Sequence, residues 1–368
     1  MATPLSPAHQ AILDRPTAFK RVLQVVAVRG VQRVDVSRWV TGGSVVADGR
    51  RTMRWSGSVE LSLPTGHPAV PDAAGDLLTP FGSRIEVALG VERQDVGTVS
   101  TVPFGHLVVT NSRVDMASGT RRVSLGLGDL ATVIDRYRFE QPFYVGPGDL
   151  ATLINAVTQD RLGVSAGLPA LGRSHQGRTL GLETDTGPWA EMVSILQAFG
   201  LTMWYDRQGI LQAGAQPDPL AGVPRPLDGP RTLSQAFDSQ PYNVAVARGE
   251  PPEGSTPVSA VVMDTNPNSP TWAGSAPGES PYGRSTVFIA SPLITDYAQA
   301  TDAATALLDR HKGEGASWEV SRPFDPTTDP DDVLRTSVPG EARRIDLAVD
   351  SVTVNFAGET VCKGRQVA

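Results

Sequence analysis

Residues 188–214 read PWAEMVSILQAFGLTMWYDRQGILQAG, and this stretch carries the signals of one short helix followed by one tight hairpin. Large apolar side chains recur in its first half at intervals of three and four residues, which places them on one face of a helix. These side chains belong to Trp189, Met192, Val193, Leu196 and Phe199. Pro188 suits the first helical turn, and Gly200 suits the left-handed residue after the last turn. We therefore predict a helix that begins at Pro188 and ends by Gly200.

The second half of the stretch predicts a hairpin. Residues 201–205 are dense in large side chains, residues 206–209 form a polar turn that ends in glycine, and a second short run follows at 210–212. One helix and one hairpin cannot bury their own apolar faces. The stretch therefore needs partners on both sides, and we interpret it as a connector between β-rich parts of the chain.

The composition favours a β-rich protein of two or three domains. The chain has 368 residues, with 37 glycines and 30 prolines scattered between short runs. Its formal net charge is −7 and it lacks a cluster of basic residues, which argues against tight binding of nucleic acid. Cys362 is the single cysteine, so one chain cannot form a disulfide or a thiolate metal cluster. No stretch is long and apolar enough to predict a membrane segment.

Segments with period-two alternation lie on both sides of the opening stretch. Residues 1–17 are predicted to be an N-terminal arm, because three prolines interrupt any regular ladder. Residues 18–138 contain seven or eight short alternating runs and predict a first β-barrel-like domain. Residues 139–214 predict an α+β connector module, which begins with a helix capped by Asp149.

The remainder of the chain predicts a second β domain. Residues 215–231 are proline-rich and predict a stiff connector. Residues 232–368 predict a second β-barrel-like domain with one alanine-rich helix near 297–311. The expected fold class is mainly β with a few helices, α+β, in which a helix-hairpin module joins two small barrel-like domains. The two β domains are expected to be structurally related.

The chemistry-bearing residues do not form a recognisable catalytic pattern. Asp329, Asp331 and Asp332 are the densest acidic cluster, but they lack the glycine and glutamate of a known calcium loop, so a solvated turn is the prediction. His106 and His175 lack metal-ligand spacing, and Cys362 has no histidine nearby in the sequence. We expect no catalytic residue, no cofactor and no metal ligand.

Aromatic side chains provide the candidate contact residues. Trp189, Phe199 and Trp204 belong to an apolar cluster that suits either the core or a subunit interface. Trp272 and Tyr282 lie in a long Pro/Gly/Ser-rich loop, residues 266–283, and amphipathic aromatic side chains in such a loop often contact a partner.

Several short segments stand in an order and spacing that can be compared with known proteins. They are Thr79-Pro80-Phe81-Gly82, Gly105–Val109, Asp129, Trp189–Gly209, Tyr242–Val246, Ser291-Pro292, the alanine-rich helix at 298–308, and Asp331-Asp332-Val333. This arrangement resembles the baseplate hub and tail-tip proteins of tailed phages, a group that includes Tal-type hubs. The likeness spans most of residues 18–365.

The resemblance implies a structural virion protein and not an enzyme. It implies a homotrimeric ring at the distal end of the tail, made in the cytoplasm of the bacterial host, in which two barrel-like domains per subunit give a pseudo-hexameric collar. The implied partners are tail tube and distal tail proteins, tip or spike proteins and the tape measure protein. Genome DNA would pass through the ring during ejection without specific binding, and the ring would take part in host attachment.

Two alternatives remain open from the residues. The chain could be a tail-associated cell-wall hydrolase, because paired carboxylates such as Glu183 and Asp185 can come together in space without a sequence motif. It could also be a carbohydrate-binding tip protein. Turnover of cell-wall sugar or peptide would favour the first alternative, and glycan binding by residues 215–368 would favour the second.

Overall fold

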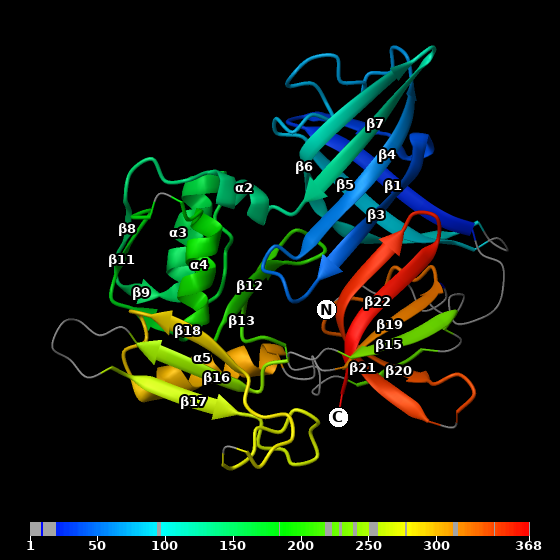
Figure 1. Cartoon of the computed structure of the whole chain (residues 1–368). Helices are drawn as coiled ribbons and strands as arrows, with labels where there is room; N and C mark the ends of the chain where they lie inside the picture. The colour runs from blue at the N-terminus through cyan, green and yellow to red at the C-terminus, as the bar shows by residue number, and fades with distance from the viewer. Residues whose placement is uncertain are drawn as a thin grey trace.

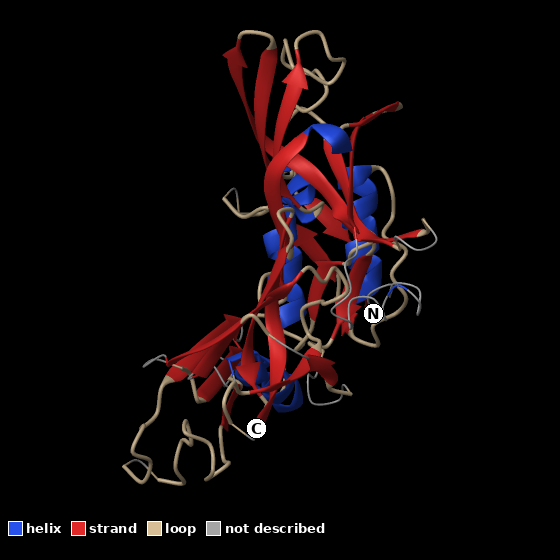
Figure 2. Ribbon diagram, turned by 90° about the vertical axis from the view of Figure 1, so that its right-hand side faces the viewer, coloured by secondary structure: helices blue, strands red, loops and turns tan. Residues whose placement is uncertain are grey.

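The computed structural model describes His9 and residues 20–93, 97–183, 185–217, 223–227, 230–237, 241–249, 257–276, 278–311, 316–341 and 343–367. Strands dominate this part of the chain and helices are few, so the predicted mainly-β, α+β class is confirmed (Figure 2). The predicted N-terminal arm, residues 1–17, lies outside the described residues apart from His9.

A first β unit contains seven strands in the order β3-β4-β7-β6-β5-β1-β2, with every neighbouring pair antiparallel. The strands are β1 (Lys20–Arg29), β2 (Gln32–Asp35), β3 (Val40–Asp48), β4 (Trp55–Pro64), β5 (Arg84–Glu92), β6 (Val99–Ala117) and β7 (Thr120–Gly128). A three-residue 3-10 turn, η1 (Ser37–Trp39), joins β2 to β3, the two ends of this order. The sheet therefore curls round on itself, and the buried residues of its alternating strands fill the interior.

A second β unit has six strands in the order β15-β19-β22-β21-β20-β14. They are β14 (Arg225–Leu227), β15 (Thr232–Phe237), β19 (Ala316–Pro323), β20 (Val333–Ser337), β21 (Arg344–Asn355) and β22 (Glu359–Gln366). The units are joined because the end of β21 pairs with the edge strand β3, from Ser351–Asp48 to Asn355–Ser44 (Figure 1). One thirteen-stranded sheet and one continuous apolar core result.

The middle module holds three helices and three small ladders. They are α2 (Ala131–Arg136), α3 (Leu150–Leu162), α4 (Pro188–Gln197), β8 (Phe143–Val145) with β11 (Arg178–Leu180), β9 (Gly148–Asp149) with β10 (Ser174–His175), and β12 (Thr202–Tyr205) with β13 (Leu211–Gly214). The helix and the hairpin predicted for residues 188–214 are both present. Pro188 begins α4, and Gly200 has the left-handed φ of +69°. Asp149 caps α3 by accepting a hydrogen bond from the Ala151 amide at 2.8 Å.

Residues 241–311 form an α/β insertion between β15 and β19. Its strands β16 (Val244–Gly249), β17 (Ser259–Met263) and β18 (Thr286–Ser291) make a separate sheet in the order β17-β16-β18, and α5 (Tyr297–His311) covers one face (Figure 1). Small side chains allow the close approach of α5, because Ala300, Ala303 and Ala304 are buried against the sheet. Residues 232–368 therefore contribute strands to two different sheets, while the predicted domain limits stay a prediction.

The predicted proline-rich connector, residues 215–231, contains a strand. Its Arg225–Leu227 segment is β14, which pairs in parallel with β20. Proline is tolerated at this position because β14 lies at the end of the sheet order, where only one side of the strand carries ladder bonds.

Candidate assembly interface

Arg207 lies in the turn between β12 and β13, where the middle module meets both the first and the second β unit. Its side chain is only 2% exposed. The guanidinium pairs with the Asp329 carboxylate and donates to the carbonyl oxygens of Pro326 and Thr328, in the loop before β20. It also stacks on the ring of Phe104 in β6, with 4.5 Å from Cζ to the ring centre. One side chain of the hairpin thus binds both β units.

The turn geometry explains why Arg207 reaches this junction. The Asp206 carboxylate accepts hydrogen bonds from the amides of Gln208 and Ile210, both at 2.9 Å, which closes the turn. Gly209 has a φ of +72°, and a Cβ there would lie 3.0 Å from the His106 ring. Only glycine therefore lets the hairpin tip pack this closely on β6.

The loop at residues 324–332 supplies a second buried ion cluster. Asp325 is 1% exposed and pairs with Arg322 at 2.7 Å and with Arg225 at 3.4 Å. Burial acts to raise the pKa of Asp325, but the two arginines and the Thr327 hydroxyl outweigh it and hold that pKa below its usual value. The charged carboxylate is therefore stabilised, and it fixes the loop against β14 and β19.

Asp329, Asp331 and Asp332 belong to this loop and not to a solvated turn, so that expectation was wrong. Burial raises the pKa of all three carboxyls, whereas Arg207 and Arg54 act in the opposite direction. Arg54 pairs with Asp331 at 3.0 Å. The sequence pattern could not show this, because the arginines come from segments more than a hundred residues away.

A third contact joins the middle module to the first β unit around Asp129. The Asp129 carboxylate is 2% exposed and accepts hydrogen bonds from the backbone amides of Ala131 at 2.9 Å and Trp55 at 3.3 Å. The Trp55 indole donates to the Tyr205 carbonyl of β12 at 2.8 Å. Burial, partly offset by the backbone donors, raises the pKa of Asp129 to about 6.

Asp129 predicts a measurable pH dependence. Because its folded-state pKa of about 6 lies above the ordinary aspartate value of 3.8, the folded chain binds this proton more tightly than the unfolded chain does. Its contribution is fully present below pH 3.8 and is lost as the pH rises through 6, with a difference of about 3 kcal/mol. Denaturant unfolding of wild type and Asp129→Asn from pH 4 to 7 tests this. The stability of wild type should fall relative to the variant across that window, and a pH-independent difference would contradict the assignment.

The predicted contact residues of the connector lie mostly inside the chain. Trp189 is 1% exposed and stacks on Tyr205, with ring centres 5.7 Å apart. Phe199 is half-buried and touches both the core of the middle module and the core under α5. Trp204 is half-buried beneath the Arg54 guanidinium, at 4.7 Å. The structure places these three side chains along contacts between parts of one chain, and a contact with another subunit stays a prediction.

Trp272 and Tyr282 lie in the predicted long loop and are both half-buried. The loop is held by Asn243, whose amide donates to the carbonyl oxygens of Thr271 at 2.9 Å and Gly283 at 2.7 Å. The Tyr282 hydroxyl donates to the Pro241 carbonyl at 2.6 Å. Hydrogen bonds therefore hold the described part of this loop to residues 241 and 243, and its role as an interface stays a prediction.

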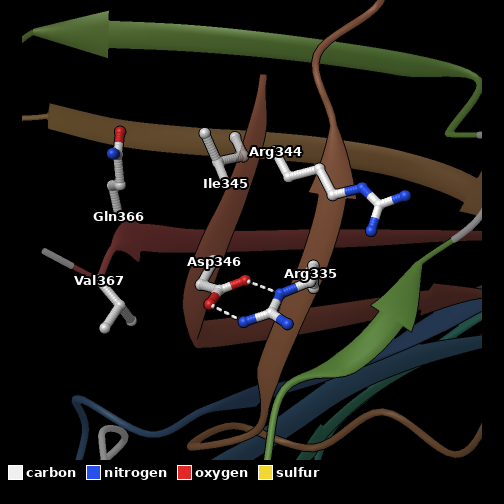
Figure 3. Close-up of a pocket in the computed structure, with 6 residues that line it drawn as sticks. All are labelled: Arg335, Arg344, Ile345, Asp346, Gln366 and Val367. Carbon is white, nitrogen blue, oxygen red and sulfur yellow. Dashed lines mark hydrogen bonds and ion pairs between the residues drawn. The ribbon is translucent and has the colours of Figure 1, made fainter. Parts of the chain in front are cut away.

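A shallow surface groove lies where β22 ends beside β21 (Figure 3). Its volume is about 370 Å³, and its lining is Arg335, Arg344, Ile345, Asp346, Gln366 and Val367. Arg335 binds Asp346 through two hydrogen bonds of 2.7 and 2.6 Å, as Figure 3 shows. The lining holds no nucleophile, so the groove offers an exposed ion pair and not a reaction centre.

The remaining chemical candidates are separated from one another. Cys362 is 2% exposed, and burial raises the pKa of its thiol to about 12, so the thiol is unreactive at neutral pH. His175 is buried in the middle module, while His106 lies beside Glu86 on the first β unit. Within the described ranges, no three histidine, cysteine or acidic side chains are grouped so as to hold a metal ion. Helices of this described part are all too short or too polar to cross a membrane.

The residues that fasten the parts together were missed from the sequence. Arg207, Arg225 and Asp325 are isolated charges in polar, turn-like segments, and such residues are usually exposed. Asp206 and Gly209 predicted the turn that presents Arg207. Nothing in the local sequence indicates that a carboxylate 122 positions away meets it.

The sequence matches no protein-family model and no curated protein. The structure, however, is similar over nearly its whole length to solved tail proteins. It matches the 43 kDa tail protein of prophage MuSo2 from Shewanella oneidensis with a TM-score of 0.61 at 13% identity, covering 93% of this chain and 98% of that one. It matches the tail protein from Neisseria meningitidis MC58 with a TM-score of 0.61 at 13% identity, over 93% and 96% of the two chains.

A third match is the prophage tail protein gp18 from Listeria monocytogenes EGD-e, with a TM-score of 0.52 at 8% identity over 94% of this chain and 95% of that one. At these identities the likeness establishes the fold. The resemblance to phage tail proteins that the residues predicted is therefore confirmed as a shared fold.

Proposed function

We propose that the chain is a structural subunit of a phage-tail baseplate hub, in which three copies form a ring that joins the tail tube to the tip. The observation that carries the proposal is the presence, in one chain, of two β units whose strands, apart from β2, follow the same order, within a fold shared with phage tail proteins. Three such chains present six similar β units. A ring of this kind can face a six-fold tube on one side and a three-fold tip on the other.

The buried contacts between the parts of the chain favour a structural role over a catalytic one. Arg207 ties the middle module to both β units, and Trp55 ties it to the first unit a second time. A subunit that must keep two β units at a fixed angle needs such fixed contacts. We propose that the protein is not an enzyme, and that Trp189 and Phe199 keep the angle between its parts.

The proposed partners follow from the place in the tail. They are the tail tube and distal tail proteins on one side, tip or spike proteins on the other, and the tape measure protein in the channel. Genome DNA would pass through the ring at the distal end of the virion tail. The net charge of −7 suits such a passage, because an acidic protein does not retain phosphates.

The proposal can be tested with the full purified chain and the tail tube protein of the same phage. Negative-stain electron microscopy of the mixture should show three-subunit rings attached to tube ends, while tube protein alone should show bare ends. A stable monomer that never joins the tube would contradict the proposal. Release of sugar or peptide from purified cell walls would instead support the hydrolase alternative.

A further inference from the structure

Apart from β2, the strands of the two β units correspond one to one. The order β3-β4-β7-β6-β5-β1 of the first unit matches β15-β19-β22-β21-β20-β14 of the second, and both series follow the same order along the chain. The α/β insertion enters between β15 and β19, where the first unit has only the short β3–β4 connection. The final pair differs, because β14 is parallel to β20 whereas β1 is antiparallel to β5.

Irregularities in the ladders also correspond. The β6–β7 ladder shifts register between Val109 and Asn111, and the β21–β22 ladder shifts between Val349 and Ser351. In each case the preceding hairpin partner stops at this point: β5 pairs with β6 as far as Val108, and β20 pairs with β21 as far as Ala348. Beyond the shift, each long strand therefore has one edge that its own hairpin does not cover.

In the second unit this edge is filled from within the chain. Residues Ser351–Asn355 of β21 pair with Ser44–Asp48 of β3, the edge strand of the first unit. In the first unit the matching edge is β6 at residues 111–117, and among the described strands none pairs with it on that side. The counterpart of β3 is β15, whose outer edge is likewise unpaired by any described strand.

The outer edge of β15 has the character of an interface. Thr232–Phe237 contains no charged residue, and almost all of its side chains are exposed, with Phe237 at 76%. Edge strands that stay solvent-exposed are usually protected by lysine, proline or a bulge, and β15 has none of these. The matching edge of β6 carries an exposed ion pair between Arg113 and Asp115 at 3.0 Å, and Met116 near its end is 70% exposed.

We propose that β15 of one subunit pairs antiparallel with residues 111–117 of β6 in a neighbouring copy, in the same way as β3 pairs with β21 within one chain. This inference rests on the proposed ring. The contact uses two different edges of each subunit, so it is heterologous and can close into a ring in which first and second β units alternate.

The internal ladder also gives the register. Asn111 lies opposite Gly126 as Ser351 lies opposite Lys363, so Asn111 is the counterpart of Ser351. Crossing the sheet from Asn111 through β7 and β4 leads to Ser44 in β3. Crossing it from Ser351 through β22 and β19 leads to Ser234 in β15, so Ser234 is the counterpart of Ser44.

Each pair observed between β3 and β21 therefore gives an expected pair between β15 and β6 of the neighbouring copy. Val46 opposite Thr353 becomes Ala236 opposite Arg113 of the neighbouring copy. Directly opposed residues in an antiparallel pair have Cβ atoms about 4.5–5.5 Å apart, close enough for a disulfide to form with a small adjustment.

Engineered cysteines test this register. The double variant Ala236→Cys with Arg113→Cys should form covalent trimers under mild oxidation, visible on a non-reducing gel. The matched control, Gln235→Cys with Arg113→Cys, moves one position along the same strand, which turns the side chain to the other face of the sheet. It should cross-link at least tenfold less. Cys362 is buried and does not compete.

Native mass measurement of the same samples after reduction tests the ring separately from the strand pairing. Trimers that cross-link only in the first variant support the strand pairing. If the protein is trimeric but the first variant fails to cross-link, or cross-links no better than the control, the pairing is overturned and the ring is not. A monomer at every concentration overturns the ring and the pairing with it. As a second check, Ala236→Lys should weaken trimer formation at least tenfold with an unchanged circular dichroism spectrum, whereas unchanged association would count against the pairing.

Discussion

Replacing Arg207 with alanine is expected to lower the free energy of unfolding by about 3–5 kcal/mol, because the change leaves a largely buried carboxylate without its hydrogen-bonded partner. Asp329 is the carboxylate, and burial already raises its pKa while Arg207 acts against that rise. The two carbonyl oxygens of Pro326 and Thr328 lose a donor at the same time. Denaturant unfolding at pH 7 measures the loss, and faster hydrogen exchange in residues 324–332 should accompany it.

Arg335→Ala is the matched control for that experiment. Arg335 also forms a two-bonded pair with an aspartate, Asp346, but its side chain is 47% exposed. Exposed pairs of this kind contribute about 1 kcal/mol or less. Equal effects of the two substitutions would show that burial of Arg207 does not fasten the parts of the chain, and would contradict the role given to this joint.

Trp189→Ala is expected to cost about 3–5 kcal/mol and to impair ring formation. The side chain is 1% exposed and stacks on Tyr205, whose carbonyl holds the Trp55 indole of the first β unit. Loss of the indole therefore loosens the packing that positions the hairpin against that unit. Unfolding measurements and native mass measurement follow both effects.

Trp272→Ala serves as the control for this second substitution, because Trp272 is half-buried in a loop of the α/β insertion and lies in none of the joints between the β units. It should cost clearly less stability and leave the contacts of the hairpin intact. Normal stability and normal ring formation of Trp189→Ala would count against the connector role of residues 188–214.

Local signals in the sequence were sufficient for the elements around this connector. Pro188, Gly200 and the polar turn ending at Gly209 predicted the helix and hairpin, because each acts through its own backbone geometry. The alternating runs predicted strands because successive side chains of a strand point to opposite faces of the sheet. The resemblance in the order of short segments predicted the tail-protein fold, although the sequence matches no protein-family model and no curated protein.

Local signals in the sequence could not predict which strands pair with one another. The strand signals at residues 242–248 and 258–263 are the same whether these strands join the second β unit or form their own sheet, and β18 was not predicted. In the structure they form their own sheet, and the small side chains of α5 pack against one face of it. The same limit hid the buried arginines, since a guanidinium in a polar turn is recognised as buried only when its distant partners are in place.

The measurement that tests the central claim most directly is the native mass of the purified full-length chain in solution. The account predicts a particle of three times the 38.9 kDa of one chain, which persists on dilution to low micromolar concentration. A single species of 38.9 kDa at all concentrations, with or without tail tube protein, would contradict it.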